Sequence, residues 1–408
     1  MQKSVFFCAL FYFGLILASN AQNLLQIQDS IASKHLDRST YFTVQLPVNY
    51  EQNKEKYYPV VYVLDGEMWL NTAVNVEKFY SGGFMPEMIL IGLDSGDDRT
   101  YEFSPTVQTV KYGMPFNAST GGANHYMDYL EQELFPFIEA NYRIKPYTTL
   151  IGHSYGGLLG AHILLEKPEL FNNYILIDPS VEWDDQVLVK KARELDFSSE
   201  NYAHKGVYIS LSGQLHMQDP LITIDNVRED QSDYTLFARS ILDFGETLSQ
   251  RDSQLNLTEE FFAEDLHGTV AIPSIRSGLM GVFMWFQMEE IYKFNSFDTP
   301  VEDLKVLVEY RSQKLKENFG YAVPPYPEDL FNGLGYMSLQ MDQPDKAKMY
   351  LEMAVQYFPH SANAYDSLSD YYIAIQQPKQ ALELVKKAAE IDDNSYYQNK
   401  IQDLEKEL

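Results

Sequence analysis

The sequence Gly152-His153-Ser154-Tyr155-Gly156-Gly157 follows directly after the apolar residues 149–151 and constrains the fold more than any other part of the chain. The pattern is typical of a nucleophile elbow, a sharp turn between a strand and a helix that holds a serine in strained backbone geometry. Glycine two positions before and after the serine avoids a side-chain clash in such a turn, and Gly152 and Gly156 occupy those positions. A helix is expected over the apolar residues 158–165. The alternative is that Ser154 merely caps this helix.

A serine hydroxyl is a poor nucleophile unless a general base lies within its reach. His267 is the candidate base, because it lies in a polar break at 264–270, between a strand-like segment at 254–257 and a helix-like run at 273–287. In α/β hydrolases the serine comes first along the chain, an acid second, and a histidine third, in a loop after a late strand. We expect His153, inside the elbow, to pack or shape the turn rather than to act as the base.

Strand-like and helix-like segments alternate through the first 290 residues. Such alternation predicts a mainly parallel sheet covered by helices, with ligands gathering at the carboxyl ends of the strands. The elbow, the turns Asp65-Gly66 and Asp178-Pro179-Ser180, and the His267 loop all fall at these ends. We therefore predict an α/β-hydrolase fold, with strands at 41–47, 58–64, 87–93, 173–177 and 206–211 and helices at 68–80 and 122–142.

The pattern changes near residue 295, and a proline cluster at 324–327 indicates a boundary. Beyond it, a shift of 34 residues aligns similar side chains, and these positions match a tetratricopeptide repeat: Phe331 with Tyr365, Leu334 with Leu368, Ala347 with Ala381, Leu351 with Val385, and Ala354 with Ala388. We predict a hydrolase domain over 22–295, a helical linker over 296–327 and an all-α repeat module over 328–408. The repeats would form a docking groove for a protein or peptide partner, or else a structural cap or dimer contact.

Residues 1–21 predict a secretory signal peptide, with a basic start, an apolar run at 5–18 and small residues before a cleavage point after Ala21. A membrane anchor is the alternative, although the run is shorter than a spanning helix needs. Cys8, the one cysteine of the chain, lies in this segment, so the mature chain would hold no disulfide and no cysteine-based zinc site. We expect a periplasmic or secreted protein with no stable membrane span.

The net charge of −27 is spread along the chain and would repel phosphate backbones and anionic lipid surfaces. This charge argues against nucleic acid as a partner. If Ser154 attacks a carbonyl, the resulting oxyanion needs two backbone N–H donors. Tyr155 follows the nucleophile and supplies one. The loop after residue 64 is well placed to supply the second, from the N–H of Glu67.

The chain from about 39 to 287 resembles the family of esterases that includes ferric-siderophore esterases, esterase D type enzymes, feruloyl and acetylxylan esterases and mycolyltransferases. The resemblance lies in residues 58–66, 98–100, 121–123, 152–157, 178–180 and 264–270. It implies an α/β-hydrolase fold and cleavage of a small-molecule ester without metal or cofactor. It also implies Ser154 as nucleophile, His267 as base and the Asp65-Gly66 loop as part of the oxyanion hole.

The match weakens at the third member of the triad, because Ser212-Gly213-Gln214 stands where many relatives carry an acidic residue. An acid between Ser154 and His267 is wanted to fix the imidazole tautomer. Asp230 is the preferred candidate, at the head of a predicted helix, and Asp219 and Glu229 are the next choices. A solvated carboxylate at a helix start is the alternative for each of these residues, and some resembling siderophore esterases are thought to use a dyad.

Three hypotheses of function follow from these residues. The first is an exported serine esterase that acts on a siderophore-like or sugar-linked acyl ester through an acyl-enzyme on Ser154. The second is a partner-binding scaffold with a degenerate hydrolase domain, suggested by Gln214. The third is an acyltransferase in which an alcohol intercepts the same acyl-enzyme.

Overall fold

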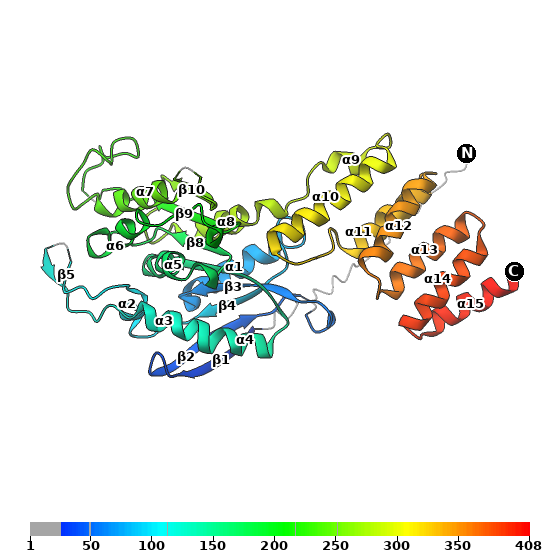
Figure 1. The fold of residues 1–408 in the computed structure, drawn as a ribbon, viewed down its shortest axis with the longest axis horizontal. Helices are drawn as coiled ribbons and strands as arrows, with labels where there is room; N and C mark the ends of the chain where they lie inside the picture. Colours follow the sequence, from blue (N-terminus) through cyan, green and yellow to red (C-terminus); the bar gives the residue numbers. More distant parts are fainter. Residues whose placement is uncertain (1–25, 49, 112, 217, 251) are drawn as a thin grey trace, which may run out of the picture.

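The computed structural model describes residues 26–408 except 49, 112, 217 and 251, and the predicted signal peptide lies outside the described residues. Its centre is an eight-stranded sheet in the order β1-β2-β4-β3-β7-β8-β9-β10 (Figure 1). The strand β2 runs antiparallel to both of its neighbours, β1 and β4, and all the other neighbouring pairs are parallel. The strands are β1 (Gln26–Ser33), β2 (Arg38–Gln45), β3 (Tyr58–Leu64), β4 (Ile89–Leu93), β7 (Ile144–His153), β8 (Asn173–Ile177), β9 (Gly206–Ser212) and β10 (Asn256–Phe262). The prediction of an α/β-hydrolase fold with a mainly parallel sheet is confirmed.

Helices cover both faces of the sheet, which is why every residue of β3, β4, β8 and β9 is buried. Successive side chains of β3 alternate between two cores: Tyr62 lies in the larger core, whereas Val61 and Val63 lie in the smaller one. The helices α1 (Gly66–Tyr80) and α8 (Ala271–Val282) contribute to the smaller core. The larger core includes residues of α3 (Ala123–Tyr129), α5 (Tyr155–Glu166), α6 (Trp183–Ala192) and α7 (Leu236–Leu248).

The helix predicted over 122–142 forms with a change of geometry in its middle. The segments α3 and α4 (Phe135–Asn141) are joined by a π-helical turn, Leu130–Leu134. Pro136 stands at the start of α4 and has no N–H to donate to the preceding turn. A wider π turn before it accommodates the ring, which an α-helical turn would crowd.

Two predicted helices differ from the observed ones at their ends. The helix expected at 273–287 is α8 followed by a short 3₁₀ turn, Met284–Phe286. The helix expected to begin near Asp230 begins at Leu236, so Asp230 lies in the loop before it.

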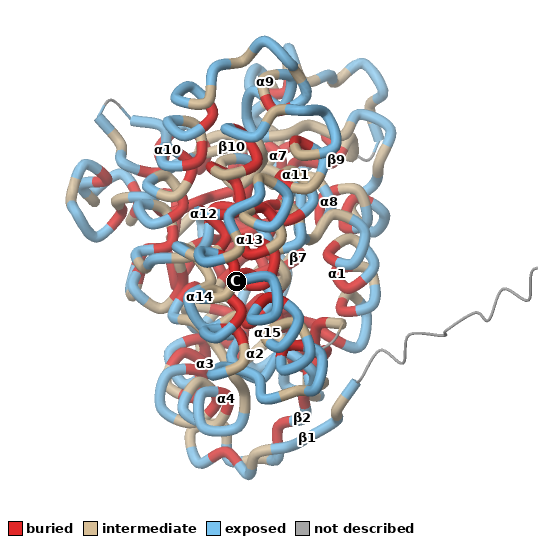
Figure 2. Tube along the Cα trace, turned by 90° about the vertical axis from the view of Figure 1, so that its right-hand side faces the viewer, coloured by how far each residue is buried: buried red, intermediate tan, exposed pale blue. Residues whose placement is uncertain are grey.

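The C-terminal region is all-helical (Figures 1 and 2). The helix pairs α11–α12 and α13–α14 begin 34 residues apart, and Gly335 of α11 lies so close to α12 that an added Cβ would sit 2.6 Å from Leu351. Assignment to a particular repeat family and the three domain boundaries stay predictions. The helices are α9 (Ile291–Asn295), α10 (Val301–Phe319), α11 (Glu328–Gln340), α12 (Pro344–Tyr357), α13 (Ala362–Ala374), α14 (Pro378–Ile391) and α15 (Ser395–Glu407).

The end of α10 joins this helical region to the hydrolase body. Phe319 packs edge-on against Tyr147 of β7, with ring centroids 5.0 Å apart, and against Trp285, at 4.9 Å. Phe319 and Leu315 are buried in the same core as α1 and α8. Within the described part of the chain, no helix is long and apolar enough to span a membrane.

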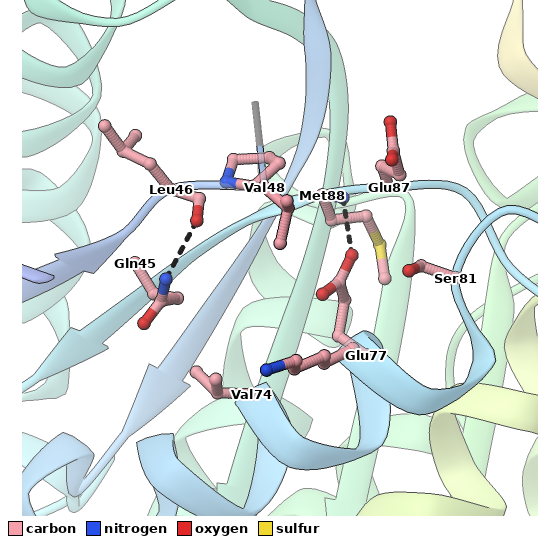
Figure 3. A pocket seen from close by; sticks show the side chains of 10 residues that line it. Gln45, Leu46, Val48, Val74, Glu77, Ser81, Glu87 and Met88 are labelled. Atoms are coloured by element: carbon pink, nitrogen blue, oxygen red, sulfur yellow. Dashed lines mark hydrogen bonds between the residues drawn. The ribbon is translucent and has the colours of Figure 1, made fainter. Parts of the chain in front are cut away.

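A cavity of about 220 Å³ lies where β2 and α1 end and β4 begins (Figure 3). Glu77, Ser81 and Met88 are among its lining residues, and the main-chain N–H of Met88 donates to Glu77 at 3.1 Å. Burial of the Glu77 carboxyl raises its pKa from 4.5 to about 7. Because Glu77 lies in the last turn of α1, this cavity is at the opposite end of that helix from the Asp65-Gly66 loop.

The raised pKa of Glu77 predicts a loss of stability as the pH rises. Between pH 4.5 and about 7 the folded protein holds a proton on Glu77 that the unfolded chain releases, so the free energy of unfolding falls across this window. Glu77→Gln removes the loss, and the variant should be more stable than the parent by roughly 2–4 kcal/mol at pH 8 but by less than about 1 kcal/mol at pH 5. Urea unfolding at both pH values measures this difference.

Glu87→Gln is the matched control, because Glu87 lines the same cavity but is one-third exposed and paired with Lys56. The charge of Glu87 is a smaller cause of the raised pKa of Glu77 than burial is, so this variant should show only a small part of the gain at pH 8. An equal effect of Glu77→Gln at both pH values would contradict the assignment.

Candidate active site

Ser154 lies in the turn between β7 and α5. Its φ of 58° and ψ of −114° form a backbone conformation that residues other than glycine rarely adopt. Gly152 makes the turn possible, because an added Cβ would lie 2.2 Å from the carbonyl oxygen of Gly156. Position 157 also has no room for a side chain, because a Cβ added to Gly157 would lie 2.8 Å from Pro179. At Gly156 the nearest atom is 3.4 Å away, so the expectation that this glycine avoids a clash is wrong.

His267 lies in the loop between β10 and α8, and the structure brings it to the nucleophile. Its Nε2 is 3.0 Å from Ser154 Oγ, and its Nδ1 is 2.7 Å from Asp178 Oδ2. The imidazole is one-third exposed, whereas the Asp178 side chain is fully buried. A carboxylate can only accept, so Nδ1 carries the proton and Nε2 is left to accept from the serine.

Asp178 follows β8, the strand beside the nucleophile's strand, and has φ of 43°. Its carboxylate accepts hydrogen bonds from the main-chain N–H and the hydroxyl of Ser212, both at 2.8 Å. Hydrogen bonds to the charged form offset the cost of burying a carboxylate. Asp178 therefore occupies the place of the triad acid.

The prediction of Asp230 as this acid is wrong, because the carboxylate that contacts His267 is that of Asp178. The Asp230 carboxylate lies 4.0 Å from Nε2 of His216 and accepts from the N–H of Ser232 at 2.6 Å. The alternatives Asp219 and Glu229 lie in the same loop after β9. The physical reason is that the carboxyl end of β8 is one strand closer to the serine, and Asp178 reaches the imidazole from there.

Gln214, where many relatives were expected to carry the acid, still contacts the base. Its Oε1 accepts from the main-chain N–H of His267 at 3.2 Å. The residue therefore supports the main chain of the His267 loop, a role for which an amide oxygen is sufficient.

The loop proposed to supply the second oxyanion donor is firmly held. Asp65 has φ of 53°, and its buried carboxylate accepts two hydrogen bonds from Arg99, at 2.5 and 2.7 Å. Arg99 also lies 3.4 Å from the carbonyl oxygen of His153, so one guanidinium connects this loop to the elbow. At Gly66 an added Cβ would lie 2.4 Å from the backbone of Gly92, which explains the glycine.

The two predicted oxyanion donors lie at the starts of helices. Tyr155 is the first residue of α5 and Glu67 the second of α1. N–H groups in the first turn of a helix have no partner within that helix and carry its partial positive charge. Their use as oxyanion donors stays a prediction.

Aromatic and cationic side chains pack against the two neighbours of the serine, Tyr155 and His267. The ring of Tyr155 packs edge-on against Trp183 at 5.5 Å, and its hydroxyl accepts from Lys111 at 3.1 Å. Phe237 packs edge-on against His267 at 5.2 Å. Within the described residues there is no cluster of three or more His, Cys, Asp or Glu side chains that could hold a metal ion.

Comparison with known proteins agrees with this geometry. Residues 33–227 match the sequence profile of a family described as putative esterase. The ferri-bacillibactin esterase BesA of Bacillus subtilis (strain 168) is 29% identical over 188 residues, which are 42% of this chain and 65% of that protein. The match thus spans slightly less than two thirds of the relative's length.

Two solved structures share the fold. A protein described as an IroE-like serine hydrolase from Shewanella oneidensis has a TM-score of 0.65 and 24% identity, and the superposition covers 82% of this chain and 100% of that one. An uncharacterised protein from Capnocytophaga ochracea DSM 7271 has a TM-score of 0.60 and 17% identity, over 93% of this chain and 99% of that one. Both matches cover more residues than precede α10, so both extend into the C-terminal helices.

Fold and site together define an α/β hydrolase in which Ser154 is hydrogen-bonded to His267, and His267 to Asp178. The matched residues 33–227, just under half of the chain, include Ser154 and Asp178 and end before His267.

The elbow geometry predicts unequal effects of alanine at its glycines. Gly152→Ala forces a Cβ into the backbone of Gly156, so the variant should lose several kcal/mol of stability or fail to fold. Gly156→Ala meets ordinary van der Waals contacts inside a helix and should change stability by less than about 1 kcal/mol. Thermal unfolding of the two variants checks the difference, and equal losses would contradict it.

Proposed function

We propose that this protein is a serine carboxylic ester hydrolase that forms an acyl-enzyme on Ser154. The observation that carries the proposal is the chain of hydrogen bonds from Ser154 Oγ to His267 Nε2, at 3.0 Å, and from His267 Nδ1 to Asp178, at 2.7 Å. An unpaired serine would need activation from elsewhere, whereas this one faces a base that is itself oriented by a buried carboxylate.

In the proposed reaction, His267 takes the proton of Ser154 as Oγ attacks the ester carbonyl. Asp178 stabilises the imidazolium, and the N–H groups of Tyr155 and Glu67 donate to the developing oxyanion. The imidazolium then protonates the leaving alkoxide, which departs as an alcohol. In the second half, His267 takes a proton from water as the water attacks the acyl-enzyme, and the acid product and free Ser154 result.

The substrate class follows from the relatives and from the side chains at the site. The curated relatives include proteins named as a ferri-bacillibactin esterase and a siderophore triacetylfusarinine C esterase. Tyr155 is a partly exposed aromatic residue directly after the nucleophile, backed by the buried Trp183, and Lys111 and Arg99 lie over the Tyr155 ring. These features favour a siderophore-like ester over a sugar-linked acyl ester.

The scaffold hypothesis was based on the absence of a carboxylate at Gln214. Asp178 supplies a carboxylate to His267, so this reason for the hypothesis no longer holds. An acyltransferase would use the same acyl-enzyme with an alcohol in place of water. Export to the periplasm or the medium remains a proposal from residues 1–21.

Replacement of the nucleophile tests the reaction directly. Ser154→Ala should abolish hydrolysis of p-nitrophenyl butyrate and labelling by a fluorophosphonate probe, because both require the activated hydroxyl. The circular dichroism spectrum should stay that of the parent. Undiminished turnover in this variant would refute the proposal.

The identity of the acid is tested by a matched pair of substitutions. Asp178→Asn should lower kcat by about 10³–10⁴-fold, because an amide favours the wrong imidazole tautomer. Asp230→Asn, the same change at the rejected candidate, should leave kcat within about two-fold, since Asp230 lies beside His216. Steady-state kinetics decide between the two residues, and the reverse ranking would restore Asp230.

A further inference from the structure

His153 directly precedes the nucleophile and makes a contact that the proposed reaction does not use. It is the last residue of β7, and the residue is only 9% exposed. Its Nε2 lies 2.8 Å from the main-chain carbonyl oxygen of His267. Two residues 114 positions apart are therefore joined by a hydrogen bond next to the reacting atoms.

The partner of this bond fixes the state of the His153 ring. A carbonyl oxygen can only accept, so Nε2 of His153 must carry a proton and donate it. Neutral imidazole with its proton on Nε2 satisfies the contact. Burial, and in second place the nearby His267, lower the pKa of His153 and favour this neutral form. Nε2 of His153 is therefore not free to act as the base, and the imidazole that Ser154 Oγ contacts is that of His267.

Ring contacts add to the hydrogen bond. The rings of His153 and His267 lie 4.8 Å apart between centroids, at 35° to one another. Trp69 of α1 packs edge-on against His153 at 5.5 Å, and Phe237 packs edge-on against His267 at 5.2 Å. Trp69 and His153 thus form one wall for the catalytic imidazole and Phe237 forms another.

His267 needs such support because its loop is open to solvent. Its side chain is one-third exposed, and its neighbour Leu266 is 58% exposed. Its main-chain N–H is bound by Gln214 and its carbonyl by His153. Asp178 restrains one ring nitrogen but does not by itself fix where the main chain of the loop lies.

We propose that His153 is a positioning residue that holds the catalytic imidazole at proton-transfer distance from Ser154, by donating a hydrogen bond to the main-chain carbonyl of His267. The inference rests on the proposed esterase function. Because His153 and Ser154 are consecutive residues at the end of one buried strand, the base is aligned against the same backbone that carries the nucleophile. Misplacement of a catalytic group by about 1 Å can cost about 10²-fold in rate.

Two substitutions separate the hydrogen bond from simple packing. The side-chain nitrogen of glutamine is as many bonds from Cα as Nε2 of histidine, so His153→Gln can still donate to the carbonyl. His153→Leu fills part of the space and cannot donate. On p-nitrophenyl butyrate, His153→Leu should lower kcat by about 10–100-fold with KM within about two-fold, whereas His153→Gln should stay within about three-fold of the parent. The rate of fluorophosphonate labelling should follow kcat.

A matched control comes from another buried histidine. His162 of α5 is 4% exposed and contacts Asn124 at 3.0 Å, away from the reacting atoms. His162→Leu should leave kcat unchanged even if it lowers the melting temperature. If His153→Leu fails to fold, His153→Asn takes its place, since its amide is one bond too short to reach the carbonyl.

Crystal structures of the variants give a readout that needs no substrate. In His153→Leu the distance from Ser154 Oγ to His267 Nε2 should exceed about 3.5 Å, the limit of a hydrogen bond, and in His153→Gln it should stay near the parent value. Unchanged kcat and distance in His153→Leu would overturn the inference, and so would equal losses in both variants. If the parent neither hydrolyses esters nor reacts with the probe, the proposed function fails, and the measured distances alone decide the role of His153.

Discussion

The hydrogen bond between Asp178 and His267 is the interaction on which the rest of the site depends. It joins a fully buried carboxylate at the end of β8 to an imidazole in the loop after β10, and so connects the centre of the sheet to its edge. Ser212, at the end of β9 between them, donates twice to the same carboxylate. Burial strengthens these bonds, because no water competes for the oxygens. The order of the strands thus sets which three side chains can meet.

Strained backbone at the carboxyl ends of the strands is the cost of this arrangement. Asp65, Ser154 and Asp178 all have positive φ, and each follows directly after a buried parallel strand. Such conformations persist only where the surroundings fix them. Arg99 holds Asp65, the main chain of Ser154 donates to Ile177, and Asp178 is held by Ser212. Three loops therefore support one another around the nucleophile.

Much of this could be predicted from the sequence, because strongly apolar runs define the parallel strands and a glycine-rich turn defines the elbow. The strands at Tyr58–Leu64 and Asn173–Ile177 match their predicted ranges. The acid could not be found in the same way. The sequence places the turn at Asp178 at the ligand-binding edge of the sheet, but chain order alone does not say whether the acid follows β8 or β9. That choice depends on the distance across the sheet, which only the fold supplies. The edge strand β1 was missed because most of its residues are exposed, so it lacks a clear apolar pattern.

The helical region joins the hydrolase body far from the nucleophile. Phe319 packs against Tyr147, near the start of β7, whereas Ser154 follows the end of that strand. His153 is the sixth residue after Tyr147 along the extended strand, a span of about 20 Å. Figure 1 shows the same arrangement, with α11 to α15 extending away from one end of the sheet. Phe319 thus connects the helical region to two elements that reach the site: β7, which ends at His153 and leads into Ser154, and the turn after α8, the helix that follows the His267 loop.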